Sequence, residues 1–382
     1  MPGPALLDAL RPRLAGMTDV LGALVAHESP SLDKPALDGM ARTLAARFAA
    51  IGGEVEVIAN PDGGDHLIAR FFPDPAGPPP ALLLAHFDTV WSVGTLAGMP
   101  WRVEAGRAFG PGAYDMKASL VLAEFALKAL GELGLRPPRP VELILTSDEE
   151  IGSPTSRRLI ERRAGEAAYA LVLEPPLPDG SLKTARKGVG QFLVTVEGRA
   201  AHAGVEPEKG LGAIDELARQ VLYLHALTDL GAGTTVNVGV VEGGTAPNVV
   251  AARASARVDV RVATAEQALV IEAAIRQLSA YTPGIRLAVE GGFNRPPMER
   301  TPAVAGLVEK ARVVGRALGL DLSEGSTGGG SDGNFTAALG LPTLDGLGAR
   351  GAGAHAHHEQ VDLDSLPERA ALLAALLMDL RI

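Results

Sequence analysis

Three short apolar runs constrain the fold of this chain most, because each has the length of one buried strand. They are ALLLAHF (81–87), VELILTSD (141–148) and YALVLEP (169–175). Apolar residues at helical spacing fill the intervals between them, at 116–133 and 156–165. This alternation of strands and helices predicts an α/β sandwich of layers, in which strand ends gather along one edge of the sheet.

The pattern changes near residue 187, where an alternating strand (187–198) begins a second series of elements. The series continues with a helix, two strands, a helix and a strand, at 209–226, 234–244, 252–263, 264–280 and 285–293. This order is typical of a ferredoxin-like α+β module. Because α/β patterning then returns, we expect one discontinuous domain of residues 1–186 and 297–382, with residues 187–296 inserted as a second domain.

The composition excludes several classes of protein. The chain has 382 residues and a net charge of -10, which argues against a nucleic-acid-binding face. It has no cysteine, so any metal site must use nitrogen and oxygen ligands. The N-terminal stretch carries Asp8, Arg11 and Arg13 where a signal peptide needs an apolar core. No run approaches the roughly 18–20 apolar residues of a membrane helix, so we expect a cytoplasmic protein with no nucleic-acid or membrane partner.

Side chains that can bind metal stand where these strands end or where the next helix begins. They are His86 and Asp88 at the end of the first run, Asp115 before the helix at 116–133, residues 148–150 at the end of the second run, and Glu174 at the end of the third. Singly, each has an ordinary explanation as a surface pair, a helix N-cap or a solvated acidic turn. Together, a histidine and several carboxylates without basic neighbours at one sheet edge indicate a divalent-cation site.

A tract of three histidines near the C-terminus adds a further candidate ligand. In GAGAHAHHEQV (351–361), His355 follows a glycine-rich stretch in which the backbone can come close to a bound group. We therefore favour His355 as the ligand, with His357 and His358 as alternatives.

Two other motif matches lack the structural context that they need. GGSDG (329–333) fits a nucleophile elbow, with Asp345 and His355 following Ser331 in hydrolase order, but the preceding EGSTGG is not a buried strand. GLGARG (346–351) fits a dinucleotide-binding fingerprint, but neither a helix nor a βαβ unit follows it. We interpret both as chance matches in glycine-rich loops.

As a set, the motifs resemble those of the M20 family of di-zinc metallopeptidases, closest to its glutamate carboxypeptidase branch. The resemblance covers nearly the whole chain and rests on HFDTV, GPGAYDMK, SDEEIGS, LEP, GRAAHAG, GGTAPNVV, DVR, GGGSDGN and GAGAH, in the family's order. It implies a zinc-exopeptidase-type α/β/α catalytic domain. It also implies that the inserted domain is a lid through which two subunits form a homodimer.

The resemblance further implies two metal positions. One Zn2+ would be held by His86, Asp115 and Glu174, and the second by Asp115, Glu150 and His355. Cobalt or manganese would also suit these ligands. The peptide bond after the bridging Asp115 would be cis, a form that is rare outside proline.

The same resemblance assigns roles to five other residues. Asp88 would orient the histidine of the first zinc, and Glu149 would be the general base toward a water that bridges the ions. His202 would reach the partner subunit's active site and stabilise the oxyanion. Asn248 and Arg261 would hold the free carboxylate of the substrate.

The implied reaction is hydrolysis of an amide bond in a small peptide or N-acyl amino acid. It would release a C-terminal amino acid, which the branch suggests is glutamate. An N-acyl-amino-acid deacylase or a dipeptidase would use the same residues. A catalytically inactive metal-binding scaffold would keep the fold without turnover. The acyl group, the preferred amino acid and the native metal remain open from the sequence.

Overall fold

The structure is a computed structural model that describes residues 3–381. It divides into two compact units, which are described separately. The first contains the residues up to 184, residues 300–327 and those from 331 onward, and the second contains residues 185–299 and 328–330. The expected inserted domain, 187–296, falls inside the second unit. Among the described residues, no helix is both long and apolar enough to cross a membrane.

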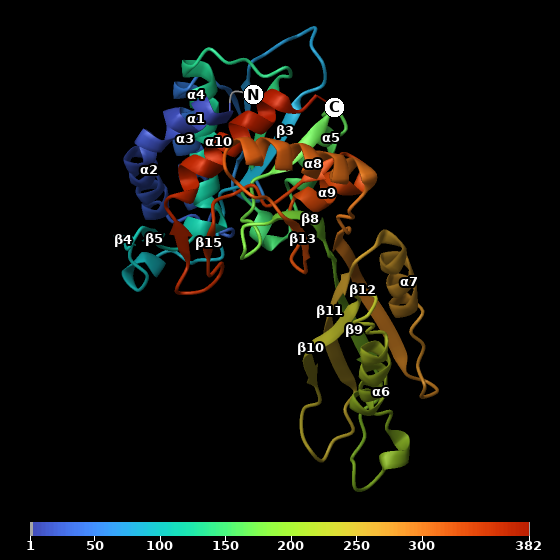
Figure 1. The fold of residues 1–382 in the computed structure, drawn as a ribbon. Helices are drawn as coiled ribbons and strands as arrows, with labels where there is room; N and C mark the ends of the chain where they lie inside the picture. The colour runs from blue at the N-terminus through green and yellow to red at the C-terminus, as the bar shows by residue number, and fades with distance from the viewer. Residues whose placement is uncertain (1–2, 382) are drawn as a thin grey trace. The chain divides into compact units, whose positions relative to one another are not determined.

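A six-stranded sheet lies at the centre of the first unit (Figure 1). Its strands, in spatial order, are β1 (Glu54–Ile58), β2 (His66–Phe71), β6 (Val141–Thr146), β3 (Ala81–His86), β7 (Tyr169–Val172) and β14 (Thr343–Leu344). From β6 to β14 the strands are parallel, whereas β1 and β2 are antiparallel to their neighbours. The three apolar runs of the sequence are thus the adjacent parallel strands β3, β6 and β7, whose carboxyl ends meet at one edge.

Alternate residues of these strands face two separate apolar layers. Leu83 and Leu143 belong to the larger core, whereas their neighbours Leu82 and Ile144 belong to the smaller one. Helices α1 (Gly3–Leu10), α2 (Leu14–Ala26), α3 (Lys34–Ala50), α4 (Ala118–Glu132), α8 (Pro302–Ala317) and α10 (Ser365–Asp379) cover the first layer, and α5 (Arg157–Ala164) and α9 (Gly333–Ala338) cover the second. The α/β sandwich predicted from the sequence is confirmed.

The structure differs from the sequence prediction at several elements. Residues 5–26 have apolar residues at helical spacing, which predicts one helix there. The structure has two helices with the 3-10 turn Arg11–Arg13 between them, because Pro12 cannot donate to the helical ladder. Helix α4 begins at Ala118 with Lys117 as its N-cap, so the interpretation of Asp115 as a cap is wrong.

Several short strands escaped prediction because two to five residues are too few to show a period. They are β4 (Arg102–Glu104), β5 (Arg107–Phe109), β15 (Gly351–Ala352) and β16 (Gln360–Asp362) in one small sheet, and the pair β8 (Leu182–Arg186) and β13 (Glu324–Thr327). The first of these sheets joins the segment before Asp115 to the segment after His355, since β5 pairs with β16.

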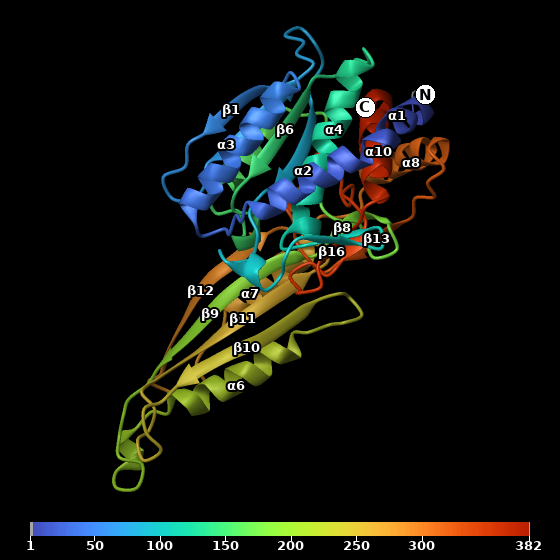
Figure 2. The same ribbon diagram turned by 90° about the vertical axis from the view of Figure 1, so that its left-hand side faces the viewer.

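The second unit is a ferredoxin-like module, as the order of its elements predicted. Its strands β9 (Gly188–Glu197), β10 (Thr235–Gly243), β11 (Arg253–Val262) and β12 (Arg286–Arg295) form an antiparallel sheet in the order β10-β11-β9-β12. Figure 2 shows these strands side by side with α6 (Ala213–Ala226), and Figure 1 shows α7 (Ala265–Arg276) beside β12. The helices and the sheet share a core of their own, which includes Val194, Leu217 and Ile275.

Candidate metal centre

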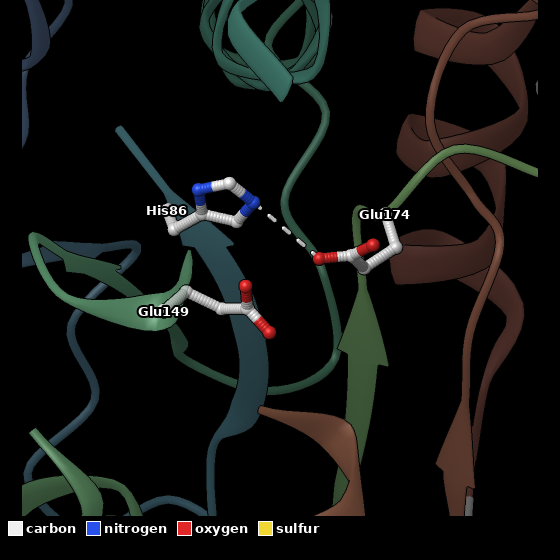
Figure 3. A group of neighbouring side chains, drawn as sticks. All are labelled: His86, Glu149 and Glu174. Carbon is white, nitrogen blue, oxygen red and sulfur yellow. Dashed lines mark ion pairs between the residues drawn. The ribbon is translucent and has the colours of Figure 1, made fainter. Parts of the chain in front are cut away.

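Three neighbouring strands bring side chains that can bind metal to one edge of the first unit's sheet. His86 is the last residue of β3, Glu149 and Glu150 lie in the turn after β6, and Glu174 follows β7. Atoms of His86, Glu149 and Glu174 that could bind a metal all lie within 4.8 Å of one another (Figure 3). His86 Nε2 and Glu174 Oε1 are 3.5 Å apart. The parallel pairing of the strands therefore accounts for this convergence.

Asp115 lies between two histidines. Its Oδ1 is 3.3 Å from His86 Nε2, and its Oδ2 is 3.4 Å from His355 Nε2. His355 Nε2 also lies 3.0 Å from Glu150 Oε2. The two oxygens of Asp115 thus face two groups of ligand-type atoms, which this one carboxylate joins.

His355 is the C-terminal histidine whose ring faces the cluster. His357 stands against Trp91, with the ring centroids 5.5 Å apart, and His358 lies beside Gly353. The backbone of His355 has a φ of 61°, in the left-handed region that residues other than glycine rarely adopt. Its side chain is half exposed, so its position depends on the loop that carries it.

The loop that carries Asp115 is held by a buried carboxylate from near the C-terminus. The Asp115–Met116 peptide bond is cis, as the resemblance implied. Glu359 accepts hydrogen bonds from the backbone N–H groups of Tyr114 and Asp115, at 2.8 and 3.0 Å. Sequence reasoning assigned no role to Glu359, because its contact with Asp115 spans 244 residues of the chain.

Asp88 is fully buried behind His86 and joins three segments of the chain. Its Oδ1 lies 3.3 Å from His86 Nδ1 and accepts a hydrogen bond from Glu149 N–H at 3.2 Å. Its Oδ2 accepts from Glu150 N–H at 3.1 Å and from Ser31 Oγ at 2.7 Å. Asp88 therefore contacts the imidazole and also fixes the backbone of both glutamates. Ser31 was also missed, because its segment, ESPSLDKP, reads only as a turn.

The charges of the cluster shift the pKa values of its members. Burial lowers the pKa of His86, but three surrounding carboxylates outweigh it and raise that pKa well above its ordinary 6.5. Asp115 and Glu150 raise the pKa of His355 to about 10. Burial, together with the charge of Asp115, raises the pKa of Glu150 to about 7. When no cation is bound, protons on His86, His355 and Glu150 therefore offset the negative charge of the surrounding carboxylates.

The set of donor atoms fits divalent cations. His86 Nε2 and Asp115 Oδ1 are buried, and neither has a hydrogen-bond partner within residues 3–381. Two such atoms facing each other at 3.3 Å are expected where both bind a third group. Imidazole nitrogens and carboxylate oxygens suit zinc, and also manganese or cobalt. The cluster is therefore a candidate metal centre.

The residues predicted to bind substrate lie in the second unit, in two separate places. Arg261 lies near the end of β11, with its Nε and Nη2 2.9 and 3.0 Å from the carboxylate oxygens of Asp259. His202 and Asn248 lie in the segments that follow β9 and β10, beyond the opposite end of β11. Eight steps of about 3.4 Å separate Arg253 from Arg261, or roughly 27 Å. The structure thus does not bring these places together within one chain.

An α/β/α unit with this set of donors at its sheet edge, joined to a ferredoxin-like unit, agrees with the metallopeptidase class that the motifs resemble. Residues 82–379 match the sequence profile of peptidase family M20/M25/M40, and the chain belongs to this family. The resemblance that its motifs indicate is thereby confirmed.

Two curated proteins and one solved structure illustrate the relationship. The chain is 34% identical over 309 residues to carboxypeptidase G2 from Pseudomonas sp. (strain RS-16), covering 78% of this chain and 73% of that protein. It is 37% identical over 158 residues to acetylornithine deacetylase from Myxococcus xanthus, covering 38% of this chain and 39% of that protein. Aminopeptidase PepT from Bacillus cereus has the same fold, with a TM-score of 0.78, 24% identity, and coverage of 96% of this chain and 98% of that chain.

Proposed function

We propose that this protein uses two divalent metal ions to hydrolyse an amide bond and release a C-terminal amino acid from a peptidyl or N-acyl substrate. Glutamate is the amino acid that we propose first. The observation that carries the proposal is the position of Asp115, whose two oxygens face His86 and His355. One carboxylate between two histidines is the arrangement that two ions with a shared ligand require. The carboxypeptidase among the relatives supports cleavage at a C-terminus.

The chain offers two overlapping sets of ligands for these ions. They are His86, Asp115 and Glu174 for the first, and Asp115, Glu150 and His355 for the second, with zinc as the first candidate metal. When bound, the ions would polarise the scissile carbonyl and lower the pKa of a water to about 7. The protein residues around them would then orient the ligands and move protons.

Glu149 is the residue that we assign to proton transfer. Its carboxylate lies close to His86 and Glu174, and its N–H donates to Asp88. As a general base it would accept a proton from the attacking water, and as an acid it would return that proton to the nitrogen of the leaving amine. Because Glu149 groups with two proposed ligands, the metal content of a Glu149→Ala variant distinguishes a base from a ligand.

The separation of His202 and Asn248 from Arg261 supports a site shared between two subunits. Arg261, held by Asp259, would bind the substrate carboxylate through a charge-assisted hydrogen bond. Residues roughly 27 Å away along β11 cannot contact the same small substrate from the same chain. His202 and Asn248 would therefore come from the partner subunit, where His202 would stabilise the oxyanion and Asn248 would assist in binding the carboxylate.

An apolar surface of the second unit supports the same homodimer. Helix α6 exposes Ile214 and Leu222, Ile214 lies against Gly243 of the adjacent edge strand β10, and β10 exposes Val241 on the same face as Gly243. Exposed apolar side chains that gather on one surface are typical of protein-binding sites. We assign this surface to the dimer contact. Leu222→Asp should shift the protein toward monomer in analytical ultracentrifugation, and an unchanged dimer would contradict the assignment.

Two other activities could use the same residues. An N-acyl-amino-acid deacylase has some support from the acetylornithine deacetylase relative, although that similarity covers 38% of this chain. A dipeptidase would differ in what lies on the amino side of the scissile bond. An inactive scaffold is less well supported, because the candidate base and all five candidate ligands are present in one cluster.

Product analysis tests the proposal. Zinc-loaded protein would be incubated with a panel of N-acyl and peptidyl amino acids, with and without chelator, and released amino acids measured by mass spectrometry. We expect chelator-sensitive release of glutamate from large acyl or peptidyl groups. Release chiefly from N-acetyl substrates would favour the deacylase. Release that ignores chelator would contradict metal-dependent hydrolysis. Ser331 would be an unexpected nucleophile for such metal-independent release, because its side chain is buried and hydrogen-bonded to Asp345.

A further inference from the structure

Glu359 is a buried carboxylate whose hydrogen-bonding capacity is filled by the segments around the cluster. Its Oε1 accepts from the N–H groups of Tyr114 and Asp115, at 2.8 and 3.0 Å. Its Oε2 accepts from Gly112 N–H at 2.9 Å and from Trp91 Nε1 at 2.8 Å. Its exposed fraction is 0%. A buried charge is stable only when its partners are well placed, so Glu359 and its four donors fix one another.

Glu359 also ends the loop that carries His355. The stretch before it, GAGAHAHH, is rich in glycine and mostly exposed or half-buried, and Glu359 is the first buried residue after His355. Its own carbonyl oxygen accepts a hydrogen bond from Gly110 N–H at 3.4 Å. One residue therefore fastens the end of the His355 loop to the loop of Asp115.

The other candidate ligands are held by different means. His86 ends a buried strand, Glu174 follows another, and the backbone of Glu150 is fixed by Asp88. The proposed position of His86, Asp115 and Glu174 thus has one ligand on a segment that Glu359 holds. The proposed position of Asp115, Glu150 and His355 has two.

We infer that Glu359 is a positioning residue that makes the two metal positions unequal, so that weakening its contacts empties the His355 position while the His86 position stays occupied. This inference rests on the proposed function, because it requires two ions. It assigns Glu359 no contact with substrate or metal. Its action is to keep Asp115 and His355 aimed at the same point.

The test compares metal binding by the full-length protein and by its Glu359→Gln variant. The glutamine amide keeps one acceptor oxygen, but its NH2 group would face N–H donors that now bond to the second carboxylate oxygen, and it cannot accept their hydrogen bonds. Metal-free protein would be titrated with Co2+, with bound metal measured by equilibrium dialysis and elemental analysis, and with the visible absorption of cobalt recorded. We expect two ions per wild-type chain. In the variant, we expect one ion of unchanged affinity and a second bound 10–100-fold more weakly.

Glu124→Gln is the matched control for the loss of a buried carboxylate. Glu124 is buried on α4 and accepts two hydrogen bonds from Arg47 of α3, at 2.7 and 2.8 Å. This control should bind two ions as the wild type does. If Glu359→Gln does not fold, Trp91→Phe replaces it, because this change removes a single donor to Glu359 and should still weaken the second ion selectively.

The outcomes separate this inference from the proposed function. Two ions in Glu359→Gln, both with wild-type affinity, would overturn the inference and leave the proposed function intact. Equal weakening of both ions, or the same loss in Glu124→Gln, would also overturn it. A wild-type chain that binds a single ion would overturn the two-ion function and the inference with it.

Discussion

Ser31 is expected to control how Asp88 holds the two glutamates, and Ser31→Ala tests this directly. Ser31 Oγ donates to Asp88 Oδ2 at 2.7 Å, which is shorter than the bonds that this carboxylate accepts from Glu149 N–H and Glu150 N–H. Ser29 provides a matched control on the same buried segment, because its Oγ donates at 2.6 Å to a neutral acceptor, the carbonyl of Phe87.

The two bonds differ in the charge of the acceptor. A hydrogen bond to a charged group contributes about 1.5–3 kcal/mol, and one between neutral groups about 0.5–1.5 kcal/mol. Ser31→Ala should therefore destabilise the protein somewhat more than Ser29→Ala. The larger difference should appear in catalysis, because Asp88 without Ser31 can turn away from the backbone of Glu149. Mutation of residues that support metal ligands typically lowers activity about 10–100-fold. Because Asp88 keeps its hydrogen bonds from Glu149 N–H and Glu150 N–H, we expect a loss at the lower end, about tenfold.

The assay is steady-state kinetics on the best substrate of the panel, with metal content measured on the same samples. We expect Ser31→Ala to lose about tenfold in kcat with little change in KM, and Ser29→Ala to keep nearly full activity. Thermal unfolding of both variants provides the stability comparison. Equal losses of kcat at equal metal content would refute the reasoning, because the cause would then be general loosening of the segment.

Three further predictions concern the base, the dimer and pH. Glu149→Ala should retain both ions and lose about 10²–10⁴-fold in kcat, and an alanine variant with normal turnover would exclude the base role. Mixing Glu149→Ala and His202→Ala proteins should restore some activity through mixed dimers, whereas no recovery after verified subunit exchange would argue against a histidine from the partner. In the metal-free protein, His355 has its pKa raised from 6.5 to about 10 and Glu150 from 4.5 to about 7. The folded state thus binds more protons than the unfolded state between these pKa values. The thermal stability of the metal-free protein should therefore fall from pH 6 to pH 10, while its metal affinity rises. Stability and affinity that do not change with pH would contradict these pKa shifts.

The layers and the residues at strand ends could be predicted because both follow from local patterns. Strands buried on both faces read as continuous apolar runs, and β3, β6 and β7 do so. Once such strands are parallel neighbours, the residues after them reach the same edge whatever the packing of the helices. The fold of the ferredoxin-like unit could likewise be predicted from the order of its strands and helices along the chain.

Two residues that organise the cluster, Ser31 and Glu359, could not be assigned from the sequence because their contacts join distant segments. Ser31 and Asp88 are 57 residues apart, and Glu359 and Trp91 are 268 apart. Most donors to Asp88 and Glu359 are backbone N–H groups, which no side-chain pattern reveals. The end of α1 at Leu10 was not predicted although Pro12 follows it, because apolar residues keep helical spacing across the proline.

The excess of acids in the first unit links metal binding to the stability of that unit. The carboxylates in and around the cluster are Asp88, Asp115, Glu149, Glu150, Glu174 and Glu359, and the histidines that face it are His86 and His355. Without ions, protons on the histidines and on Glu150 limit the repulsion between these acids. Bound dications would replace those protons. The free energy of ion binding would therefore also stabilise the ordered conformation of the strand ends. The second unit has a separate core, and the proposed ligands all lie outside it. Loss of the ions should therefore weaken the cluster while leaving the second unit, and the dimer surface proposed on it, folded.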